Sequence, residues 1–344
     1  MGQHYVGLDV SLEMTSVCVL DEAGAIVWRG KVASTPEAIA AAIRAHAPQV
    51  ARIGLETGPL CTWHWHRLRA LGLPVVCLDA RHAKVALSLQ LNKTDANDAH
   101  GLAQIVRMGW YKEVAVKSLD SHRLRTLLSS RAQLVNMRRD LATKIRGVLK
   151  TFGKVVGKIG DRGFAARVSE LAAGEAGLEE AVTALLAVRE RLEQQIEALE
   201  TRILRFAKHS DPCRRLMTIP GVGVLTAVSF VAAVDDPARF GRSSGVGAYF
   251  GLTPRRYQSG EVDRDGKVSK CGDALTRTYL FEAAGTLLFR VAKWSALKAW
   301  GTRLARRVGS KKARVALARK LAVLMHRVWT DGTEFRWSKE AATA

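Results

Sequence analysis

The sequence predicts an α/β domain at the N-terminus, a helical coiled-coil middle and a mainly α-helical C-terminal domain. Three observations support this order. Residues 1–112 alternate short apolar runs with turn residues, residues 113–210 carry apolar side chains at helical and heptad spacing, and residues 211–344 combine helical stretches with many Lys and Arg. The chain has 344 residues, which is long enough for about two domains of typical size.

The N-terminal domain begins with three apolar runs that predict strands, at residues 5–10, 16–20 and 25–32. Thr35 followed by Pro36 is typical of a helix start, and predicts a helix through residue 45. Two further strands and two further helices are expected after it, with strands at 52–56 and 74–78 and helices at 62–71 and 82–91. The order βββαβαβα predicts a mixed sheet covered by helices, as in ribonuclease-H-like domains.

The middle of the chain has the apolar periodicity of long helices. In the second stretch, residues near heptad a and d positions are apolar: Leu185, Leu192, Ile196, Leu199, Ile203 and Phe206. Residues 153–177 lie between the two helical stretches, are rich in glycine and predict a loop or hinge. We expect a helical hairpin that packs as a coiled coil, within or between subunits, or as a simple helical core.

The C-terminal domain opens with Ile219-Pro220-Gly221-Val222-Gly223 before an apolar helix. This pattern is similar to helix-hairpin-helix modules, in which glycines let backbone N–H groups approach a phosphate. A Pro-Gly turn before an ordinary core helix has the same pattern, so both interpretations stay open.

The charge balance predicts a polyanionic partner. The chain has 53 Lys and Arg against 32 Asp and Glu, a formal charge of +21. Nucleic acid is favoured over acidic lipids or a merely soluble basic protein. Residues 283–330 contain twelve cations and no acid, and we expect their helices to follow a phosphate backbone. The cations predicted to bind nucleic acid there are Arg303, Arg306, Arg307, Lys311, Lys312 and Arg314.

The remaining composition predicts a cytoplasmic protein. The five cysteines are scattered and form no CxxC pair, which indicates a reducing compartment and neither disulfides nor a thiolate zinc site. No secretion signal opens the chain. Its longest apolar run, residues 222–234, is shorter than the roughly 20 residues that cross a bilayer.

Four carboxylates are candidates for a shared site. Asp9 and Glu56 end apolar strands, and Asp95 and Asp98 share one face if a helix begins near Thr94. Such a cluster requires hard cations, Mg²⁺ or Mn²⁺, and two of these can assist phosphoryl transfer. Singly, each acid could merely end a strand or cap a helix. The opening is also similar to the phosphate loop of actin-like ATPases, whose second phosphate loop is not evident here.

The chain resembles the transposases of the insertion sequence 110 family, also called DEDD transposases. The resemblance spans nearly the whole chain, through Gly7-Leu8-Asp9-Val10-Ser11, Leu55-Glu56-Thr57-Gly58 and the block 93–99 in the first part, and then 219–223, 249–254, 258–260 and 268–272. It implies a RuvC-like domain that carries the four acids, a coiled coil, and a C-terminal transposase domain. The acids Asp9, Glu56, Asp95 and Asp98 would be metal ligands.

The resemblance also implies a nucleophilic serine in the C-terminal domain. Ser259 in Gln258-Ser259-Gly260 is the candidate by motif position, with Ser269 as the second choice, although from the residues alone Ser259 could be a turn residue. Nearby cations would balance phosphate charge: Arg255, Arg256, Arg264, Lys267 and Lys270. Further implications are donor and target DNA bridged by an element-encoded noncoding guide RNA, a dimer or tetramer, and nucleoid association in a bacterial cytoplasm.

Two other functions are compatible with the residues. A metal-dependent nuclease that resolves Holliday junctions would use the four acids with water as the nucleophile, so that Ser259 would be dispensable. A noncatalytic nucleic-acid-binding protein would retain affinity whatever replaces Asp9. Substitution of each residue by Ala separates these alternatives.

Overall fold

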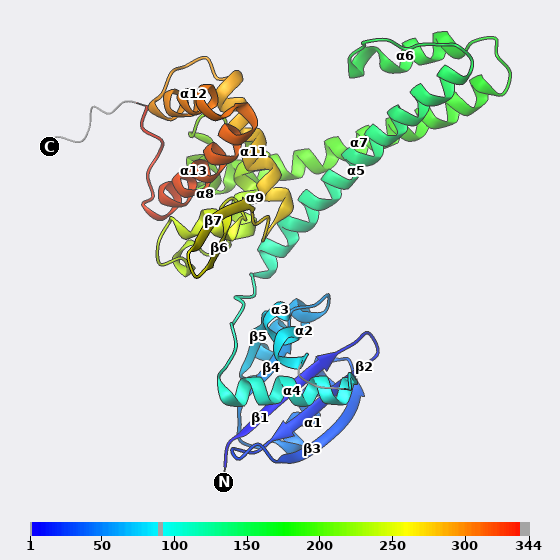
Figure 1. The fold of residues 1–344 in the computed structure, drawn as a ribbon. Coiled ribbons are helices and arrows are strands. Elements are labelled where there is room, and N and C mark those ends of the chain that lie inside the picture. Colours follow the sequence, from blue (N-terminus) through cyan, green and yellow to red (C-terminus); the bar gives the residue numbers. More distant parts are fainter. Residues whose placement is uncertain (1, 89–91, 338–344) are drawn as a thin grey trace. The chain divides into compact units, whose positions relative to one another are not determined.

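The computed structural model describes residues 2–88 and 92–337 (Figure 1). The chain forms two compact units, Met1–Lys117 and Ser118–Ala344. Each unit has its own buried apolar core. No helix among the described residues has both the length and the apolar character needed to span a membrane.

The first unit is built on a five-stranded mixed sheet, which confirms the predicted strands. The strands are β1 (His4–Val10), β2 (Met14–Leu20), β3 (Ile26–Ala33), β4 (Val50–Glu56) and β5 (Val75–Leu78). Their order in the sheet is β3-β2-β1-β4-β5, with β1, β2 and β3 antiparallel and with β4 and β5 parallel to β1. The carboxyl ends of β1 and β4 therefore meet at one edge of the sheet.

Helices cover both faces of this sheet. They are α1 (Pro36–His46), α2 (Cys61–Ala70), α3 (Ala80–Leu87) and α4 (Asp95–Met108). Val6 and Leu8 of β1 pack in the core that α1 and α2 cover, whereas Gly7 faces α4. Because side chains alternate along a strand, Asp9 faces α4 as Gly7 does. The predicted helix at 82–91 begins earlier, at Ala80, and residues 89–91 of that prediction lie outside the described residues.

The second unit contains the long helices α5 (Leu119–Thr151) and α7 (Leu178–His209), which lie side by side and antiparallel (Figure 1). Ion pairs fix their register, between Arg131 and Glu200 at 2.6 Å and between Arg138 and Glu193 at 3.7 Å. The buried residues of α7 include Leu192, Ile196 and Ile203, from the predicted heptad positions.

The prediction of a loop over residues 153–177 is wrong for its central part. Helix α6 (Asp161–Ala172) lies there, with Phe164, Val168 and Ala172 buried against the ends of α5 and α7. Their spacing of four residues is helical. Of the six glycines in this segment, five flank the helix, and Gly163 lies in its first turn, outside the spacing of the three apolar residues. Asp161 at its first turn accepts a hydrogen bond from Arg189 at 3.2 Å.

The rest of the second unit is mainly helical, as expected. Its helices are α8 (Asp211–Met217), α9 (Val224–Val234), α10 (Gly245–Tyr249), α11 (Ala274–Phe289), α12 (Ala296–Val308) and α13 (Ser310–Thr330), with a short 3-10 turn η1 (Pro237–Arg239). One element is additional: the hairpin of β6 (Pro254–Ser259) and β7 (Val262–Val268). Every residue of β6 is exposed, so this strand lacks the apolar alternation by which strands are recognised in a sequence.

The turn between α8 and α9 contains the Pro-Gly motif. Gly221 has a φ of +87°, and a Cβ there would lie 2.5 Å from the carbonyl oxygen of Ala283. Glycine is therefore required for the close approach of α11 to this turn. Packing accounts for Gly221, and a phosphate-binding role for the motif stays a prediction.

Candidate active site

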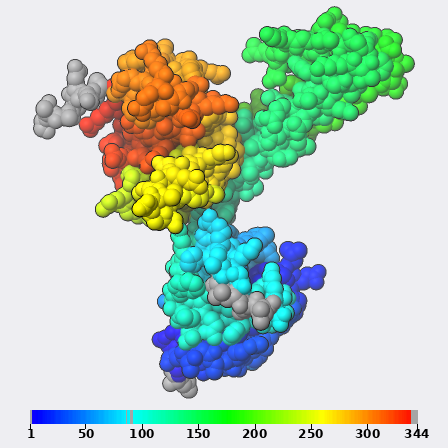
Figure 2. All heavy atoms as spheres, viewed as in Figure 1, coloured from blue at the N-terminus to red at the C-terminus, as the bar shows by residue number. Residues whose placement is uncertain are grey.

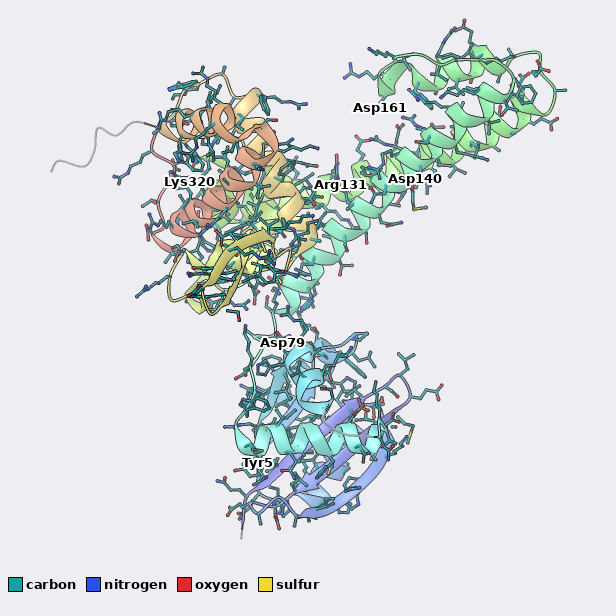
Figure 3. All side chains as sticks on the ribbon, viewed as in Figure 1. Tyr5, Asp79, Arg131, Asp140, Asp161 and Lys320 are labelled. Carbon is teal, nitrogen blue, oxygen red and sulfur yellow. The ribbon has the colours of Figure 1, made fainter. Side chains whose placement is uncertain are left out.

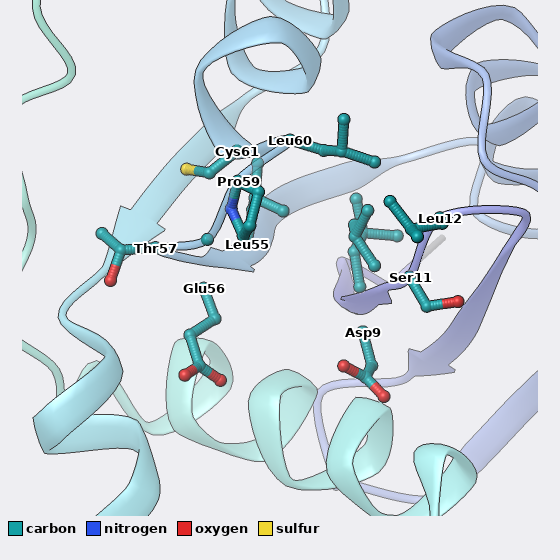
Figure 4. A pocket seen from close by; sticks show the side chains of 12 residues that line it. Asp9, Ser11, Leu12, Leu55, Glu56, Thr57, Pro59, Leu60 and Cys61 are labelled. Atoms are coloured by element: carbon teal, nitrogen blue, oxygen red, sulfur yellow. The ribbon is translucent and has the colours of Figure 1, made fainter. Parts of the chain in front are cut away.

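Asp9 and Glu56 lie near the carboxyl ends of two neighbouring parallel strands, β1 and β4. Leu8 pairs with Leu55, so the two acids follow at equivalent positions of β1 and β4. Figure 4 shows both carboxylates directed toward α4 in a cleft of about 350 Å³, which Ser11 and Thr57 also line. The two predicted strand-end acids are thus brought together.

Helix α4 supplies the other two acids. Thr94 caps its N-terminus by accepting a hydrogen bond from the Asn97 N–H at 3.2 Å, so α4 begins at Asp95, as predicted. Asp98 is half-buried and lines a second cleft of about 330 Å³ together with Glu56. Asp95 is exposed and forms an ion pair with Lys31 of β3 at 2.8 Å.

Electrostatics connect these carboxylates. Burial, followed by repulsion from Asp98 and Asp95, raises the pKa of Asp9 above its usual value. Burial, followed by repulsion from Asp9 and Asp98, likewise raises the pKa of Glu56. The hydrogen bond from Lys31 instead lowers the pKa of Asp95. The inner three acids therefore repel one another in a partly desolvated site, whereas Asp95 already has a cationic partner.

Two lysines near the acids were not singled out from the sequence. Lys93 lowers the pKa of both Asp9 and Glu56 and lines the second cleft. Lys31 of β3 also lowers the pKa of Asp9. The two residues lie on either side of Ser16 of β2, which pairs with Asp9 in β1 and with Lys31 in β3. Lys93 immediately precedes Thr94, the N-cap of α4. Its closeness in sequence to Asp95 and Asp98 is a signal by which it could have been predicted to lie near the acids. The position of Lys31 depends on strand register, which the sequence does not reveal directly.

The acids fit a hard divalent cation by their chemistry. All of the donors are carboxylate oxygens, and their mutual repulsion favours a bound positive charge. Within residues 2–88 and 92–337, no three His, Cys, Asp or Glu side chains form a ready-made ligand cluster. Mg²⁺ does not require such a cluster, since it is usually held by one or two carboxylates, waters and substrate phosphates.

The β6–β7 hairpin carries the candidate serine. Ser259 ends β6, pairs with Val262 across the tip of the hairpin and is exposed. Ser269 lies beyond the base of the hairpin, is partly buried, and donates its N–H to the carbonyl of Thr253 at 2.9 Å. Of the two serines, Ser259 is therefore the one that a large substrate can reach more easily.

Cations surround this hairpin. Arg256 forms an ion pair with Asp263 across the two strands, and the guanidinium of Arg264 lies 5.7 Å from the centre of the Tyr257 ring. The other predicted cations of this region, Arg255, Lys267 and Lys270, are exposed as well. The hairpin thus presents a serine at its tip and carries four cations, Arg255, Arg256, Arg264 and Lys267, beside three acids, Glu261, Asp263 and Asp265.

The basic C-terminal helices divide into two groups. Five of their predicted nucleic-acid-binding residues are exposed on α12 and α13: Arg303, Arg306, Arg307, Lys311 and Lys312. Arg314 differs, because its guanidinium carbon lies 3.8 Å from the centre of the Phe281 ring and its side chain packs against Gly285 of α11. Arg314 is therefore placed where it joins α11 to α13.

Comparison with known proteins identifies the family. A sequence model of the DEDD transposases of IS110, described as "Transposase", matches residues 6–153, and one described as "Transposase IS116/IS110/IS902 family" matches residues 213–299. The transposase for insertion sequence element IS1111A of Coxiella burnetii is 29% identical over 96% of this chain and 91% of its own. A probable family 20 transposase of Pseudomonas aeruginosa is 28% identical over 79% of this chain and 82% of its own. The pilin gene-inverting protein of Moraxella bovis is 29% identical over 35% of this chain and 37% of its own. This chain belongs to the IS110 family of DEDD transposases, enzymes that act on DNA.

Proposed function

We propose that this transposase excises and inserts a mobile DNA element by metal-dependent strand cleavage and exchange. The metal ligands are Asp9, Glu56, Asp95 and Asp98, and Ser259 is the nucleophile. The observation that carries the proposal is the electrostatic coupling of Asp9 and Glu56 at the strand ends with Asp98 on α4, which together with burial raises the pKa of Asp9 and Glu56. Membership of the DEDD transposases implies dependence on a divalent metal, and Mg²⁺ suits an all-oxygen donor set.

The carboxylates bind the metal in their ionised form. A divalent ion bound there would stabilise the charge that develops on phosphate oxygens during transfer. Asp9 and Glu56 supply the two ligands at the strand ends, and Asp98 lies across from them on α4. Asp95 can join them only if it leaves Lys31, so this ion pair competes with metal ligation. Lys93 offsets part of the negative charge until a substrate phosphate arrives.

Ser259 would form a covalent link to DNA. Its Oγ bonds to the phosphorus of a phosphodiester and loses its proton, while the bond from phosphorus to the leaving deoxyribose oxygen breaks and that oxygen takes up a proton. The exposure of Ser259 and the cations of the hairpin support this role. The link between Ser259 and DNA is itself a phosphodiester, so the energy of the broken bond is retained. The hydroxyl of a second DNA strand end can therefore displace the serine and complete the exchange.

The test is cleavage of labelled element-end DNA with Mg²⁺ by four proteins: wild type, Ser259→Ala, Ser269→Ala and Asp9→Asn. We expect cleavage to be lost with Ser259→Ala and Asp9→Asn and to be retained with Ser269→Ala. DNA binding, measured in parallel, should persist in all four. Loss of cleavage only with Ser269→Ala would transfer the nucleophile to Ser269.

A hydrolytic nuclease remains the second candidate because the acid cluster alone could activate water. Cleavage that survives both Ser259→Ala and Ser269→Ala would establish it. The name of the Moraxella bovis relative describes inversion of a pilin gene, and an inversion requires strands to be rejoined as well as cut. That similarity supports recombination for the present chain.

The guide RNA is also part of the proposal. The exposed cations of α12 and α13 can bind RNA or DNA phosphates, and base pairing would then select the sequence. To test this, the gene is expressed with its flanking DNA, and the RNA that copurifies with the protein is sequenced. A discrete RNA that maps to the flanks is expected. Random RNA that dissociates as salt rises would contradict guidance.

Oligomerisation through the α5–α7 hairpin completes the proposal. The hairpin already pairs its two helices within one chain, and it leaves Met137 of α5 and Val188 and Leu204 of α7 exposed. We propose that a second copy of the hairpin covers some of these side chains, as in coiled coils between subunits. Sedimentation should show a dimer or tetramer, and a monomer at all concentrations would contradict this part of the proposal.

A further inference from the structure

We propose that a groove between the base of the β6–β7 hairpin and helix α13 binds an unpaired base of the DNA strand that the hairpin engages. The identity of that strand rests on the proposed function. The groove has a volume of about 1020 Å³. Figure 2 shows the hairpin atoms, in yellow, beside the orange atoms of the C-terminal helices. Its lining residues belong to the hairpin and its flanks, to α12 and to α13, all within the second unit.

The floor of the groove is apolar. Val315, Ala316 and Val323 of α13 form it together with Trp300 of α12, and Val268 of β7 lies opposite them. Ala316 and Val323 are seven positions apart and lie almost in line along α13, and Val315 lies about a quarter of a turn from them. All three therefore face the groove on one broad side of the helix. Trp300 is half-buried: it packs against the core of the second unit and also lines the groove.

The rim of the groove is cationic. Five cations line it, Lys267, Lys270, Lys312, Arg319 and Lys320, against a single acid, Asp265. Figure 3 marks Lys320 on α13, and its ammonium lies 4.3 Å from the centre of the Trp300 ring. An aromatic ring and aliphatic side chains surrounded by cations are complementary to one ligand chemistry, a flat base joined to phosphates.

This chemistry favours single-stranded DNA over the other occupants. An apolar protein segment would leave the five rim cations without partners, which is costly once they are desolvated. Duplex DNA would satisfy the cations but could not reach the floor, because its bases are stacked inside the helix. An unpaired nucleotide satisfies both parts of the groove.

The position of the groove fits the strand that Ser259 would attack. Ser259 pairs with Val262 at the tip of the hairpin, and Pro254 pairs with Val268 at its base. A strand rises about 3.3 Å per residue, so the five steps from tip to base span roughly 17 Å. A DNA strand whose phosphate lies at the tip therefore needs only a few nucleotides to place a base in the groove.

The test measures binding, in the Ser259→Ala protein without divalent metal, so that no strand is cut. The probes are a single-stranded DNA oligonucleotide containing 2-aminopurine, the same strand in a duplex, and the RNA of the same sequence. Trp300→Ala should weaken single-stranded DNA binding at least about fivefold, since stacking on an aromatic side chain contributes that much per base. Duplex binding should change less than about twofold, and Trp300→Phe should restore most of the affinity.

Trp294 provides the matched control. It is also a tryptophan beside a lysine, with Lys298 at 5.5 Å from its ring, but it is 62% exposed and does not line the groove. Trp294→Ala should therefore leave both affinities unchanged. Thermal unfolding of each variant verifies that Trp300→Ala is folded. Lys267→Gln combined with Lys312→Gln tests the rim and leaves both the floor and Lys320 beside Trp300 unchanged.

Three results would overturn the proposal. The first is an equal loss of affinity for single strand and duplex, the second is an effect confined to RNA, and the third is unchanged DNA binding with a loss of self-association. The third would assign the groove to a second copy of the chain. None of these results depends on whether Ser259 cleaves DNA, so this inference and the proposed function can fail separately.

Discussion

Gly7 of β1 lies directly against the backbone carbonyl of Ala99 in α4. A Cβ at Gly7 would lie 2.0 Å from that oxygen and 2.4 Å from the Ala103 nitrogen. Gly54, which pairs with Gly7 across β1 and β4, faces the same helix, and a Cβ there would lie 2.6 Å from Val106 Cγ1. The two glycines let α4 approach the sheet closely. This contact holds Asp98, next to Ala99, over the carboxylates of the strand ends.

Gly7→Ala should therefore destabilise the first unit and disturb the acid site together. The added methyl group meets backbone atoms, which cannot rotate away, so we expect a loss of about 1–3 kcal/mol or more, the usual cost of overpacking. Denaturant unfolding measures the loss, and the stabilisation of the protein by Mg²⁺ should decrease as well.

Gly147→Ala is the control for that substitution. Gly147 lies within α5, and a Cβ there would meet nothing within 4 Å. This change should be neutral or stabilising by about 0.5–1 kcal/mol, because alanine loses less entropy than glycine in a helix. Equal effects of the two substitutions would show that the close contact at Gly7 does not matter.

Asp9→Asn should stabilise the metal-free protein at pH 7. The pKa of Asp9 is raised in the folded state above 3.8, so folding is favoured while the group is protonated, and this contribution is lost as pH rises through the folded pKa. At pH 7 the ionised Asp9 therefore lowers the free energy of unfolding, and Asp9→Asn removes this destabilisation. The gain in the free energy of unfolding should shrink as pH falls toward 3.8. Thermal unfolding measures the gain.

Mg²⁺ should separate this variant from the wild type. The ion stabilises the wild-type protein by binding the folded state, and Asp9→Asn should lose most of that stabilisation. Asp140, exposed on α5 (Figure 3), gives the control. Asp140→Asn should alter neither the stability of the metal-free protein nor its stabilisation by Mg²⁺. A destabilised Asp9→Asn protein that keeps its full response to Mg²⁺ would contradict the assignment of Asp9 as a ligand.

The basic helices predict a measurable salt dependence. Combined substitution of Arg303, Arg306 and Arg307 by Gln should weaken duplex DNA binding and reduce the slope of log K against log salt by up to about 0.9 for each lost phosphate contact. Arg314→Gln should leave the slope unchanged but lower the midpoint of thermal unfolding, because Arg314 packs against Phe281. A reduced slope with Arg314→Gln would show that its guanidinium reaches DNA after all.

Local signals predicted the first unit closely. Apolar alternation predicted the strands, and the Thr35 and Thr94 caps predicted two helix starts, because these signals act within a few residues of the element they define. The same signals placed Asp9 and Glu56 at strand ends and Asp98 on the first turn of α4. Lys31 was missed since it reaches Asp95 from a strand 64 residues away, through the register of the sheet.

The second unit was harder to predict where its residues are exposed. The β6–β7 hairpin has no buried face and hence no apolar pattern. Composition predicted Arg314 to face DNA, yet its side chain lies against α11, since a guanidinium can pack on an aromatic ring as well as on a phosphate. A count of charges does not distinguish these two environments.

The central claim is that Ser259 becomes covalently joined to DNA. Its most direct test incubates the wild-type protein with Mg²⁺ and labelled element-end DNA, stops the reaction with detergent and looks for labelled protein. We predict a detergent-stable adduct that peptide mass spectrometry places on Ser259 and that is absent from Ser259→Ala and from Asp9→Asn. Cut DNA without any adduct, with cleavage retained in Ser259→Ala, would contradict the claim and identify water as the nucleophile.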